Sequence, residues 1–248
     1  MKAILFGFFI YSVVVLAPAI TFSQDGKDWE FELAPFYLWA LSIDGDMGIR
    51  GKTASVGVEF SDIWDNLQGV FTVRFNAMYR KKFGLLFDYN YLDLGKEKLT
   101  DVVNAEVEFK AQILNLAGTY RVVDNNHILD AVAGIRYTIM DAGIDLKNIG
   151  QSLNGDEDWV DPIVGLRYAY QINDKWALRL YGDIGGFGVS SDFTWQGLGM
   201  IDFQPWKNVA FVAGYRGIGT DYESGSGTDT FTYDAVVHGP VIGLDIRW

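Results

Sequence analysis

The sequence ends with Val241-Ile-Gly-Leu-Asp-Ile-Arg-Trp248, where apolar and polar side chains alternate until the chain stops on an aromatic residue. A period of two residues is typical of a β-strand that has one apolar and one polar face. The apolar face carries Ile242, Leu244, Ile246 and Trp248. The other face carries Gly243, Asp245 and Arg247. The last strand therefore needs an apolar environment on one side only.

The amino terminus has the pattern of a secretory signal peptide. Lys2 precedes an apolar run, and the small residues of Ala17-Pro18-Ala19 and Thr21-Phe22-Ser23 offer cleavage sites. The run is short for a membrane-spanning helix, which makes a membrane anchor the less favoured alternative. We predict a signal peptide over residues 1–23, cleaved after Ala19 or Ser23, and a single barrel domain over residues 24–248.

Composition excludes several classes of protein. The chain has no cysteine, so a disulfide scaffold and a thiolate metal site are both ruled out. Its formal net charge is −12, and nucleic-acid binding requires basic surfaces instead. Beyond the signal peptide we find no apolar stretch of about 20 residues, the length that a transmembrane helix needs. We therefore expect no nucleic-acid partner, and we predict no cofactor.

Strand-like segments recur along the chain, separated alternately by short turns and longer polar loops. An even strand number returns the last strand to the side where the first began, as in single-chain bacterial barrels. The fold class we predict is all-β: a transmembrane antiparallel up-and-down β-barrel of ten strands, with eight or twelve as alternatives. The ten strands cover approximately 28–42, 70–81, 83–95, 105–122, 128–145, 160–171, 176–189, 193–204, 208–219 and 231–248.

Two segments depart from simple alternation. In strand 105–122 the phase slips near Gln112 to Asn115, which predicts a bulge or an upper half that stands above the membrane. In the first long loop, 43–69, Phe60, Ile63, Trp64 and Leu67 have helical spacing. This spacing predicts a short amphipathic helix in that loop. A small hairpin around Gly51-Lys52 would precede the helix, and could instead extend the barrel to twelve strands.

The prolines lead to a hypothesis about how the barrel closes. Pro35 lies in the first predicted strand and Pro240 in the last, and these two strands must pair to close the ring. Proline lacks the N–H that a β-ladder uses. We therefore expect a weakened or bulged seam near both prolines.

The C-terminal stretch resembles the closing strand of Gram-negative outer-membrane β-barrels. Members of this class commonly end on an aromatic residue, with a hydrophobic residue two positions earlier and a glycine five positions earlier; here these are Trp248, Ile246 and Gly243, while Val241 stands where a polar residue is usual. The segment 35–67 also resembles the N-terminal part of poorly characterised outer-membrane proteins. The resemblance implies a small barrel, similar to the OmpA and OmpW types, located in the outer membrane.

The same resemblance implies partners. Gly243, Ile246 and Trp248 would act as the assembly signal for the barrel-assembly machinery, and outer-membrane lipid and lipopolysaccharide would surround the folded protein. We expect a monomer. Acidic loops at Asp44 to Asp46, Asp156 to Asp158 and around Asp221 offer oxygen ligands for divalent cations, although none has EF-hand spacing and a solvated acidic surface is favoured.

Charged residues alternate with the apolar positions of the predicted strands. A charge on the lipid face would cost roughly 2–4 kcal/mol near the midplane, so we expect these side chains to point into the lumen. The predicted lumen network consists of Arg74, Asp88, Arg136, Arg167, Arg179, Asp183, Arg216 and Asp245. It favours a narrow, salt-bridged lumen and a structural or surface-interaction role. The alternative is a narrow passive channel for ions or small solutes, gated by the loop 43–69.

Catalytic chemistry has few candidate residues. The chain has only two histidines, His127 in a predicted turn and His238 in the last strand. Hydrolases of membrane barrels typically place a histidine beside a serine or an acid, and the sequence around His238 has no neighbouring serine. We predict that the protein is not an enzyme, and keep an outer-membrane lipid hydrolase as a minor alternative.

Overall fold

The computed structural model describes residues 28–49, 52–60, 67–98, 105–146 and 151–248. It is built from β-strands, with a short 3-10 turn, η2 (Gly227–Asp229), between the last two strands. The predicted signal peptide, 1–23, and residues 61–66 of the predicted loop helix lie outside the described residues. In the described ranges, no helix has the length and apolar character needed to cross a bilayer.

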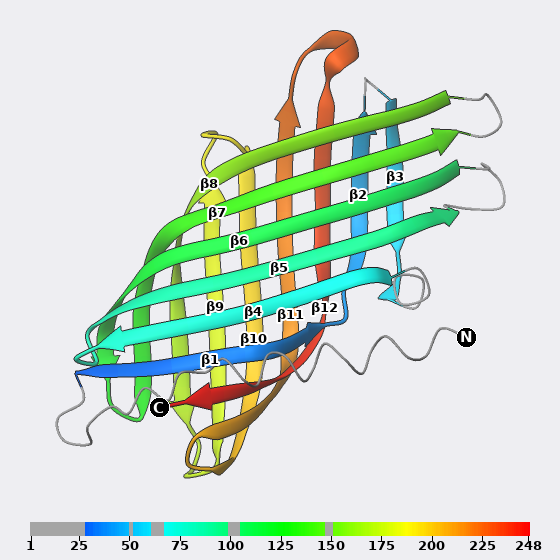
Figure 1. Cartoon of the computed structure of the whole chain (residues 1–248). Helices are drawn as coiled ribbons and strands as arrows, with labels where there is room; N and C mark the ends of the chain where they lie inside the picture. Colours follow the sequence, from blue (N-terminus) through cyan, green and yellow to red (C-terminus); the bar gives the residue numbers. More distant parts are fainter. Residues whose placement is uncertain (1–27, 50–51, 61–66, 99–104, 147–150) are drawn as a thin grey trace, which may run out of the picture.

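Twelve strands form one antiparallel sheet (Figure 1). The first six are β1 (Trp29–Trp39), β2 (Ser42–Ile49), β3 (Lys52–Val58), β4 (Leu67–Tyr79), β5 (Phe83–Lys98) and β6 (Ala105–Asp124). The last six are β7 (His127–Leu146), β8 (Gln151–Gln171), β9 (Trp176–Gly186), β10 (Phe193–Trp206), β11 (Val209–Ser224) and β12 (Phe231–Arg247). Leu67, which the sequence placed in a helix, starts a strand instead.

The sheet closes because β1 pairs with both β4 and β12. The ring runs through β1 and then β4 to β12, which gives the ten-stranded barrel that the sequence predicts. The predicted hairpin is present as β2 and β3, but it does not enlarge the ring. Both β1 and β2 pair with the same edge of β12, one after the other. β1 pairs with the second half of β12, from Val241 to Arg247, and β2 pairs with the first half, from Phe231 to His238.

One end of the barrel has only short connections. Three-residue or shorter turns join β4 to β5, β6 to β7 and β10 to β11, and the start of β1 and the end of β12 lie at this same end (Figure 1). Short turns and both chain ends mark the periplasmic end of an outer-membrane barrel. We call this the turn end, and the opposite end the loop end.

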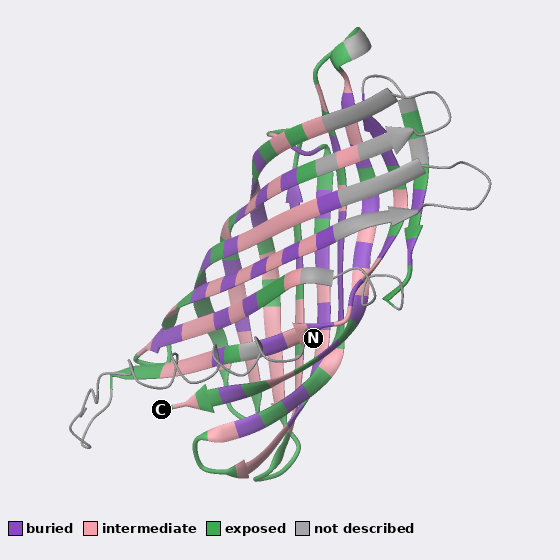
Figure 2. Ribbon diagram, turned by 45° about the vertical axis from the view of Figure 1, so that its right-hand side comes forward, coloured by how far each residue is buried: buried purple, intermediate pink, exposed green. Residues whose placement is uncertain are grey.

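The outer wall carries large apolar side chains that are only partly covered by the rest of the protein. Leu166 on β8, Ile201 on β10 and Ile242 on β12 are each about half exposed, at 55%, 48% and 56%. Burying such a side chain gains roughly 1.5–3 kcal/mol, so a whole belt of them is stable only against an apolar surrounding such as lipid. Exposed residues alternate with buried ones along these strands in Figure 2.

Aromatic side chains gather at the turn end. Phe83 packs edge-on against Tyr120 with 5.4 Å between ring centroids, and Trp176 packs against Phe203 at 4.7 Å. Trp206 is 61% exposed. Rings with an apolar body and a polar edge are typical of the membrane–water interface.

Strand β6 explains the phase slip in the sequence. Its pairing with β7 is continuous through Gln112–Ile139 and Asn115–Arg136, so the expected bulge at this point is wrong. The polarity of the two faces inverts instead. Below this level Leu116 faces outward and Asn115 is buried inside, whereas above it Phe109 is buried inside. This inversion agrees with the other explanation that the sequence left open, an upper half of the strand that stands above the membrane.

The seam between β1 and β12 is bulged at Pro35, as predicted, whereas the described pairings have no register shift at Pro240. The register shifts between Leu33 and Phe36, which bracket Pro35, so β1 contains one more residue than the facing stretch of β12. Near Pro240 the strands approach closely, and a Cβ atom built on Gly239 would lie 1.9 Å from the carbonyl oxygen of Ala40. Only glycine fits at this point of the seam.

Candidate functional site

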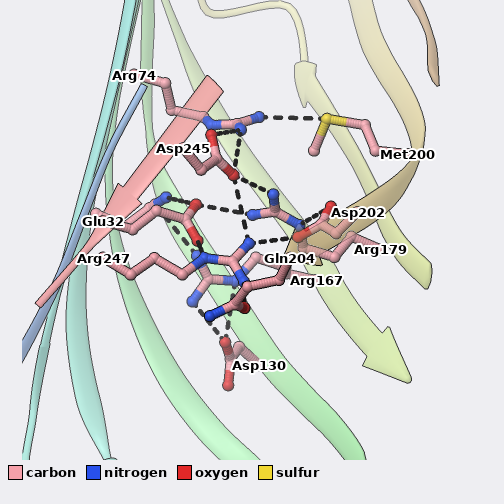
Figure 3. Close-up of polar contacts among 11 residues, drawn as sticks. Glu32, Arg74, Asp130, Arg167, Arg179, Met200, Asp202, Gln204, Asp245 and Arg247 are labelled. Atoms are coloured by element: carbon pink, nitrogen blue, oxygen red, sulfur yellow. Dashed lines mark hydrogen bonds and ion pairs between the residues drawn. The ribbon is translucent and has the colours of Figure 1, made fainter. Parts of the chain in front are cut away.

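Charged side chains from opposite walls meet inside the barrel near the turn end (Figure 3). We call this cluster the lower network. Asp245, on the closing strand β12, is fully buried and lies at its centre. It accepts hydrogen bonds from Arg74 on β4 at 3.1 Å, and from Arg179 on β9 and Arg247 on β12. One carboxylate thus holds three guanidinium groups, which come from separate parts of the wall.

Glu32, on β1, is the second anchor of the lower network. It accepts hydrogen bonds from Arg179 at 2.7 Å and from Arg247 at 3.1 Å. Arg179 also donates from Nε to Asp202 at 2.8 Å. Since Arg179 lies on β9 and Glu32 on β1, these contacts bridge strands that are not neighbours in the sheet. The lower network therefore crosses the lumen.

Asp130 extends the lower network toward β6 and β8. It is fully buried and bonds to Arg167 at 2.6 Å and to Arg121 at 2.8 Å. Arg167 also donates to Asn76 at 3.2 Å, and Asn76 donates to Glu32 at 3.1 Å. The chain of contacts thus continues from β8 back to β1.

A second cluster, which we call the upper network, lies closer to the loop end. Arg136 on β7 is 1% exposed and donates to both oxygens of Asp183 on β9 at 2.9 Å. Its Nε donates to Asn115 at 2.9 Å, and its Nη1 donates to Thr194 at 2.9 Å. Each of these partners is buried, so the guanidinium is held by protein groups in place of water.

Arg216 completes the upper network from the other side. It lies on β11 and donates to Asp88 on β5 at 3.1 Å and to Asn90 at 3.1 Å. Gln196 accepts from both Arg216, at 3.1 Å, and Arg136, at 3.0 Å. This amide joins the two arginines, so the upper network is a continuous bar from β5 through β11 and β10 to β7.

The structure places all eight residues of the predicted lumen network inside the barrel, in two groups. Arg74, Arg179 and Asp245 meet in the lower network, together with Arg167. The upper network pairs Arg136 with Asp183 and Arg216 with Asp88. The lower network also uses side chains beyond the predicted set: Glu32, Arg121, Asp130, Asp202 and Arg247. Glu32 alternates with the apolar residues Phe31 and Leu33 before the bulge at Pro35, so the strand pattern was a signal that could have placed it on the inner face.

Above the upper network the lumen is filled by apolar side chains. Trp159 on β8 stacks on Tyr222 of β11 with ring centroids 4.1 Å apart, and both residues are buried. Met140, Phe231 and Ile49 belong to the same packed cluster. The part of the barrel that stands above the membrane is therefore flattened on an apolar core, much as two packed sheets are.

Cavities inside the barrel lie between the turn end, the two charge networks and the apolar core. The turn end holds a vestibule of about 590 Å³, which is bounded by lower-network residues such as Arg167, Arg179 and Arg247. The two inner cavities are far smaller, at about 50 Å³ and 40 Å³. The vestibule therefore does not continue as a wide passage through the two networks.

The two histidines lie on the outside of the barrel. His127, which the sequence placed in a turn, is the first residue of β7 and bonds through Nδ1 to the hydroxyl of Tyr168 at 2.7 Å. His238 bonds through Nδ1 to Tyr215 at 2.5 Å and through Nε2 to Asp44 at 2.8 Å. Both ring nitrogens of His238 are thus engaged, and within the described contacts neither partner is a serine.

Acidic residues form a row on the outer face near the loop end. Asp221 on β11 faces Asp234 on β12, which in turn faces Asp46 on β2. Partial burial and the nearby carboxylates of Asp234, Asp192 and Glu223 raise the pKa of Asp221. Across the described part of the chain, no group of three or more acidic or histidine side chains is arranged to hold a metal ion.

The three residues of the predicted assembly signal lie at the closing seam. Trp248 stacks on Phe31 of β1 with ring centroids 5.6 Å apart, and its backbone exchanges two hydrogen bonds with Phe31, at 3.0 and 3.1 Å. Gly243 pairs with Tyr37, and Ile246 pairs with Leu33. The last strand thus contacts β1 up to its final residue.

Comparisons with known proteins agree on the fold. No protein-family model and no curated protein sequence matches the chain. Among solved structures, the chain is similar to the outer membrane protease OmpT from Escherichia coli, with a TM-score of 0.58 and 9% identity over 92% of this chain and 99% of that one.

Weaker likenesses include Ail of Yersinia pestis, with a TM-score of 0.36 at 15% identity over 89% of this chain and 97% of that one. OprG of Pseudomonas aeruginosa has a TM-score of 0.34 at 12% identity, over 91% and 98% of the two chains. With its closed ring of ten strands and its apolar outer belt, the chain has the fold of a bacterial outer-membrane β-barrel.

Proposed function

We propose that this protein is a closed outer-membrane barrel with a structural or surface-interaction role, and that it conducts neither ions nor small solutes. The observation that carries the proposal is the pair of charge networks across the lumen. Arg216 joins β11 to Asp88 on β5, and Arg179 joins β9 to Glu32 on β1. A solute that passed through the barrel would have to separate both bridges.

The energetics favour a closed state. Removing one partner from a buried ion pair costs roughly 3–5 kcal/mol, because the other charge is left without water or a counter-ion. Asp245 binds Arg74, Arg179 and Arg247 at once, so no single side-chain rotation frees a path beside it. A conducting pore needs sites that release their ion readily. Side chains held by several charge-assisted hydrogen bonds do not supply such sites.

The region above the membrane supports a role at the cell surface. Its interior is packed by residues such as Trp159 and Tyr222, so its outer face is held on a rigid sheet. That face carries the row Asp221, Asp234 and Asp46. Exposed carboxylates suit contact with cationic groups. Lipopolysaccharide is anionic, and its contact with this row would require bridging divalent cations.

Solute flux into liposomes tests the proposal. Liposomes that contain the refolded protein should swell no faster than empty liposomes in an isotonic solution of a small sugar. A sixteen-stranded porin, reconstituted at the same protein-to-lipid ratio, provides the positive control. Complete folding is checked by the shift in gel mobility between boiled and unboiled samples. Swelling at a rate above that of empty liposomes would refute a closed lumen and favour the narrow channel.

A further inference from the structure

A small cavity lies inside the barrel between the upper network and the apolar core. Its volume is about 40 Å³. The wall includes Trp39 at the end of β1, Leu41 in the connection to β2 and Ile43 in β2, together with Phe109 of β6 and Met140 of β7. Its floor is polar, because Arg136 of the upper network also lines it. The cavity is therefore apolar around its sides and polar at one end.

Trp39 brings an unused hydrogen-bond donor to this wall. The residue is 4% exposed, and its indole Nε1 has no hydrogen-bond partner among the described residues. The guanidinium of Arg216 lies over the Trp39 ring, 4.8 Å from its centroid, which fixes the ring against the upper network. A buried donor without an acceptor is unfavourable, and nearly all buried indole N–H groups have a partner. This donor calls for an acceptor in the cavity.

The wall of the barrel is incomplete beside the cavity. The pairing of β1 with β4 ends at Ala34 and Arg74, although β4 continues for seven residues on the loop side of Arg74. In the described ranges, that part of β4 pairs only with β5. Val70 and Thr72, which line the cavity, lie on this unpaired stretch. The adjacent outward residue Phe71 is 53% exposed. On this side the cavity is therefore lined by a stretch of β4 that has no hydrogen-bonded partner in β1.

The charges near the cavity restrict the chemistry of a ligand. Arg136 is already neutralised by Asp183, and Arg216 by Asp88. A carboxylate or phosphate would therefore bring an unpaired negative charge into an interior with little water, which is strongly unfavourable. A neutral acceptor, such as a carbonyl oxygen, avoids this cost and still satisfies the Trp39 donor.

We propose that this cavity binds a neutral, mainly apolar molecule with a single hydrogen-bond acceptor, such as a ketone or an ester, and that the acceptor bonds to Trp39 Nε1. The cavity holds roughly three groups of the size of a water molecule, so only the acceptor end would enter it, and the apolar remainder would lie along the edge of β4 that β1 leaves unpaired. This site goes beyond the proposed closed barrel, since binding from the side does not require a path through the networks.

Indole N–H resonances test the proposal directly. The refolded barrel in detergent micelles, labelled with ¹⁵N-tryptophan, is titrated with 2-nonanone and separately with nonane, which matches its chain but has no acceptor. We expect the ketone to shift the Trp39 N–H resonance downfield in a saturable manner, and nonane to leave it without a downfield shift. W39F removes this resonance and so assigns it. The exposed Trp195 reports non-specific partition into the micelle.

A second variant separates ligand binding from local structure. A111L adds bulk to the cavity wall and keeps Trp39, so the ketone should no longer shift the Trp39 resonance while the barrel stays folded by gel mobility. The proposal is overturned if 2-nonanone leaves the Trp39 resonance in place, if Trp39 and Trp195 shift equally, or if A111L binds the ketone as tightly as the original chain. The experiment does not measure conductance, so a negative result for the binding site is distinguishable from a negative result for the closed lumen.

Discussion

Arg216 and Asp88 face each other across the lumen, from β11 and β5, with Nη2 and Oδ1 3.1 Å apart. These strands are not neighbours in the sheet. The arginine side chain is fully buried and that of the aspartate is 9% exposed, so neither group can exchange its partner for bulk water. The pair acts as a crossbar that holds the two walls at a fixed separation.

Loss of this crossbar should destabilise the barrel strongly. We expect R216M to lower the free energy of unfolding by about 3–5 kcal/mol, because Asp88 would be left buried without its cation. Urea unfolding in lipid vesicles, followed by tryptophan fluorescence, measures the change. The matched control is R80A, which breaks the exposed Arg80–Asp28 pair and should cost about 1 kcal/mol or less. Equal losses for the two variants would contradict a crossbar role.

The acidic row predicts a stabilising substitution. Asp234 lies directly between Asp221 and Asp46, and like charges that face each other across a sheet repel by roughly 0.2–1 kcal/mol per pair. We expect D234N to raise the unfolding free energy at pH 7 in the presence of a chelator. Thermal unfolding measures this change. A loss of stability in D234N under these conditions would show that the carboxylates do not repel.

The pH dependence of the same row has a definite sign. Burial and neighbouring carboxylates raise the pKa of Asp221 above its ordinary value. The folded chain therefore binds this proton more tightly than the unfolded chain, and its contribution to stability falls as pH rises through the folded-state pKa. We expect the advantage of D234N to shrink when unfolding is measured near pH 4. An advantage that grows at low pH would contradict this assignment.

The closing seam should depend on glycine at position 239. A Cβ atom there would lie 1.9 Å from the carbonyl oxygen of Ala40, which belongs to the backbone and cannot rotate away. We expect G239A to lower the melting temperature by several degrees and to reduce the fraction of heat-modifiable barrel. The control is G118A, whose added Cβ would have its nearest contact at 3.9 Å. A normal barrel yield for G239A would show that the backbones at Gly239 and Ala40 can move apart without loss of the closed barrel.

The C-terminal residue should matter more for assembly than for final stability. Trp248 stacks on Phe31 at the seam and stands at the end of the predicted assembly signal. We expect W248A to slow folding into liposomes that contain the barrel-assembly machinery, and to refold in detergent with nearly normal yield. W206A removes another rim tryptophan and should leave the assisted rate unchanged. If both variants slowed assisted folding equally, Trp248 would be only one of several tryptophans that anchor the barrel at the membrane interface.

Much of the fold was predictable because strand alternation is a local property. The positions of strands such as β7 and β12 follow from a period of two, and an even number of strands accounts for both chain ends lying at the turn end. The slip near Gln112 was visible, but the sequence left two causes open. A bulge and an inversion of polarity both interrupt the alternation of apolar and polar residues in the sequence of one strand. Only the register between β6 and β7 distinguishes the two.

The contents of the lumen were predictable only in part. Alternation identifies which face of a strand carries Arg216 or Asp88, because a charged side chain avoids lipid. It does not identify the partner, since pairing across a lumen depends on the tilt and stagger of strands that lie far apart in sequence. Glu32 could have been included, because it alternates with the apolar residues Phe31 and Leu33 on the part of β1 that precedes the bulge at Pro35. The apolar filling above the upper network likewise depends on where the strands leave the membrane.

Single-channel recording with and without residues 43–69 tests the closed lumen most directly. The shortened variant joins Ser42 to Val70 by a brief linker, and so removes the β2–β3 hairpin while it keeps Asp88, Arg216 and Asp245. We expect no conductance steps from either protein in planar bilayers, because the two networks still cross the barrel. Steady steps from the intact protein, or steps that appear only in the shortened variant, would contradict a lumen closed by these networks, and the second outcome would identify the segment 43–69 as a gate.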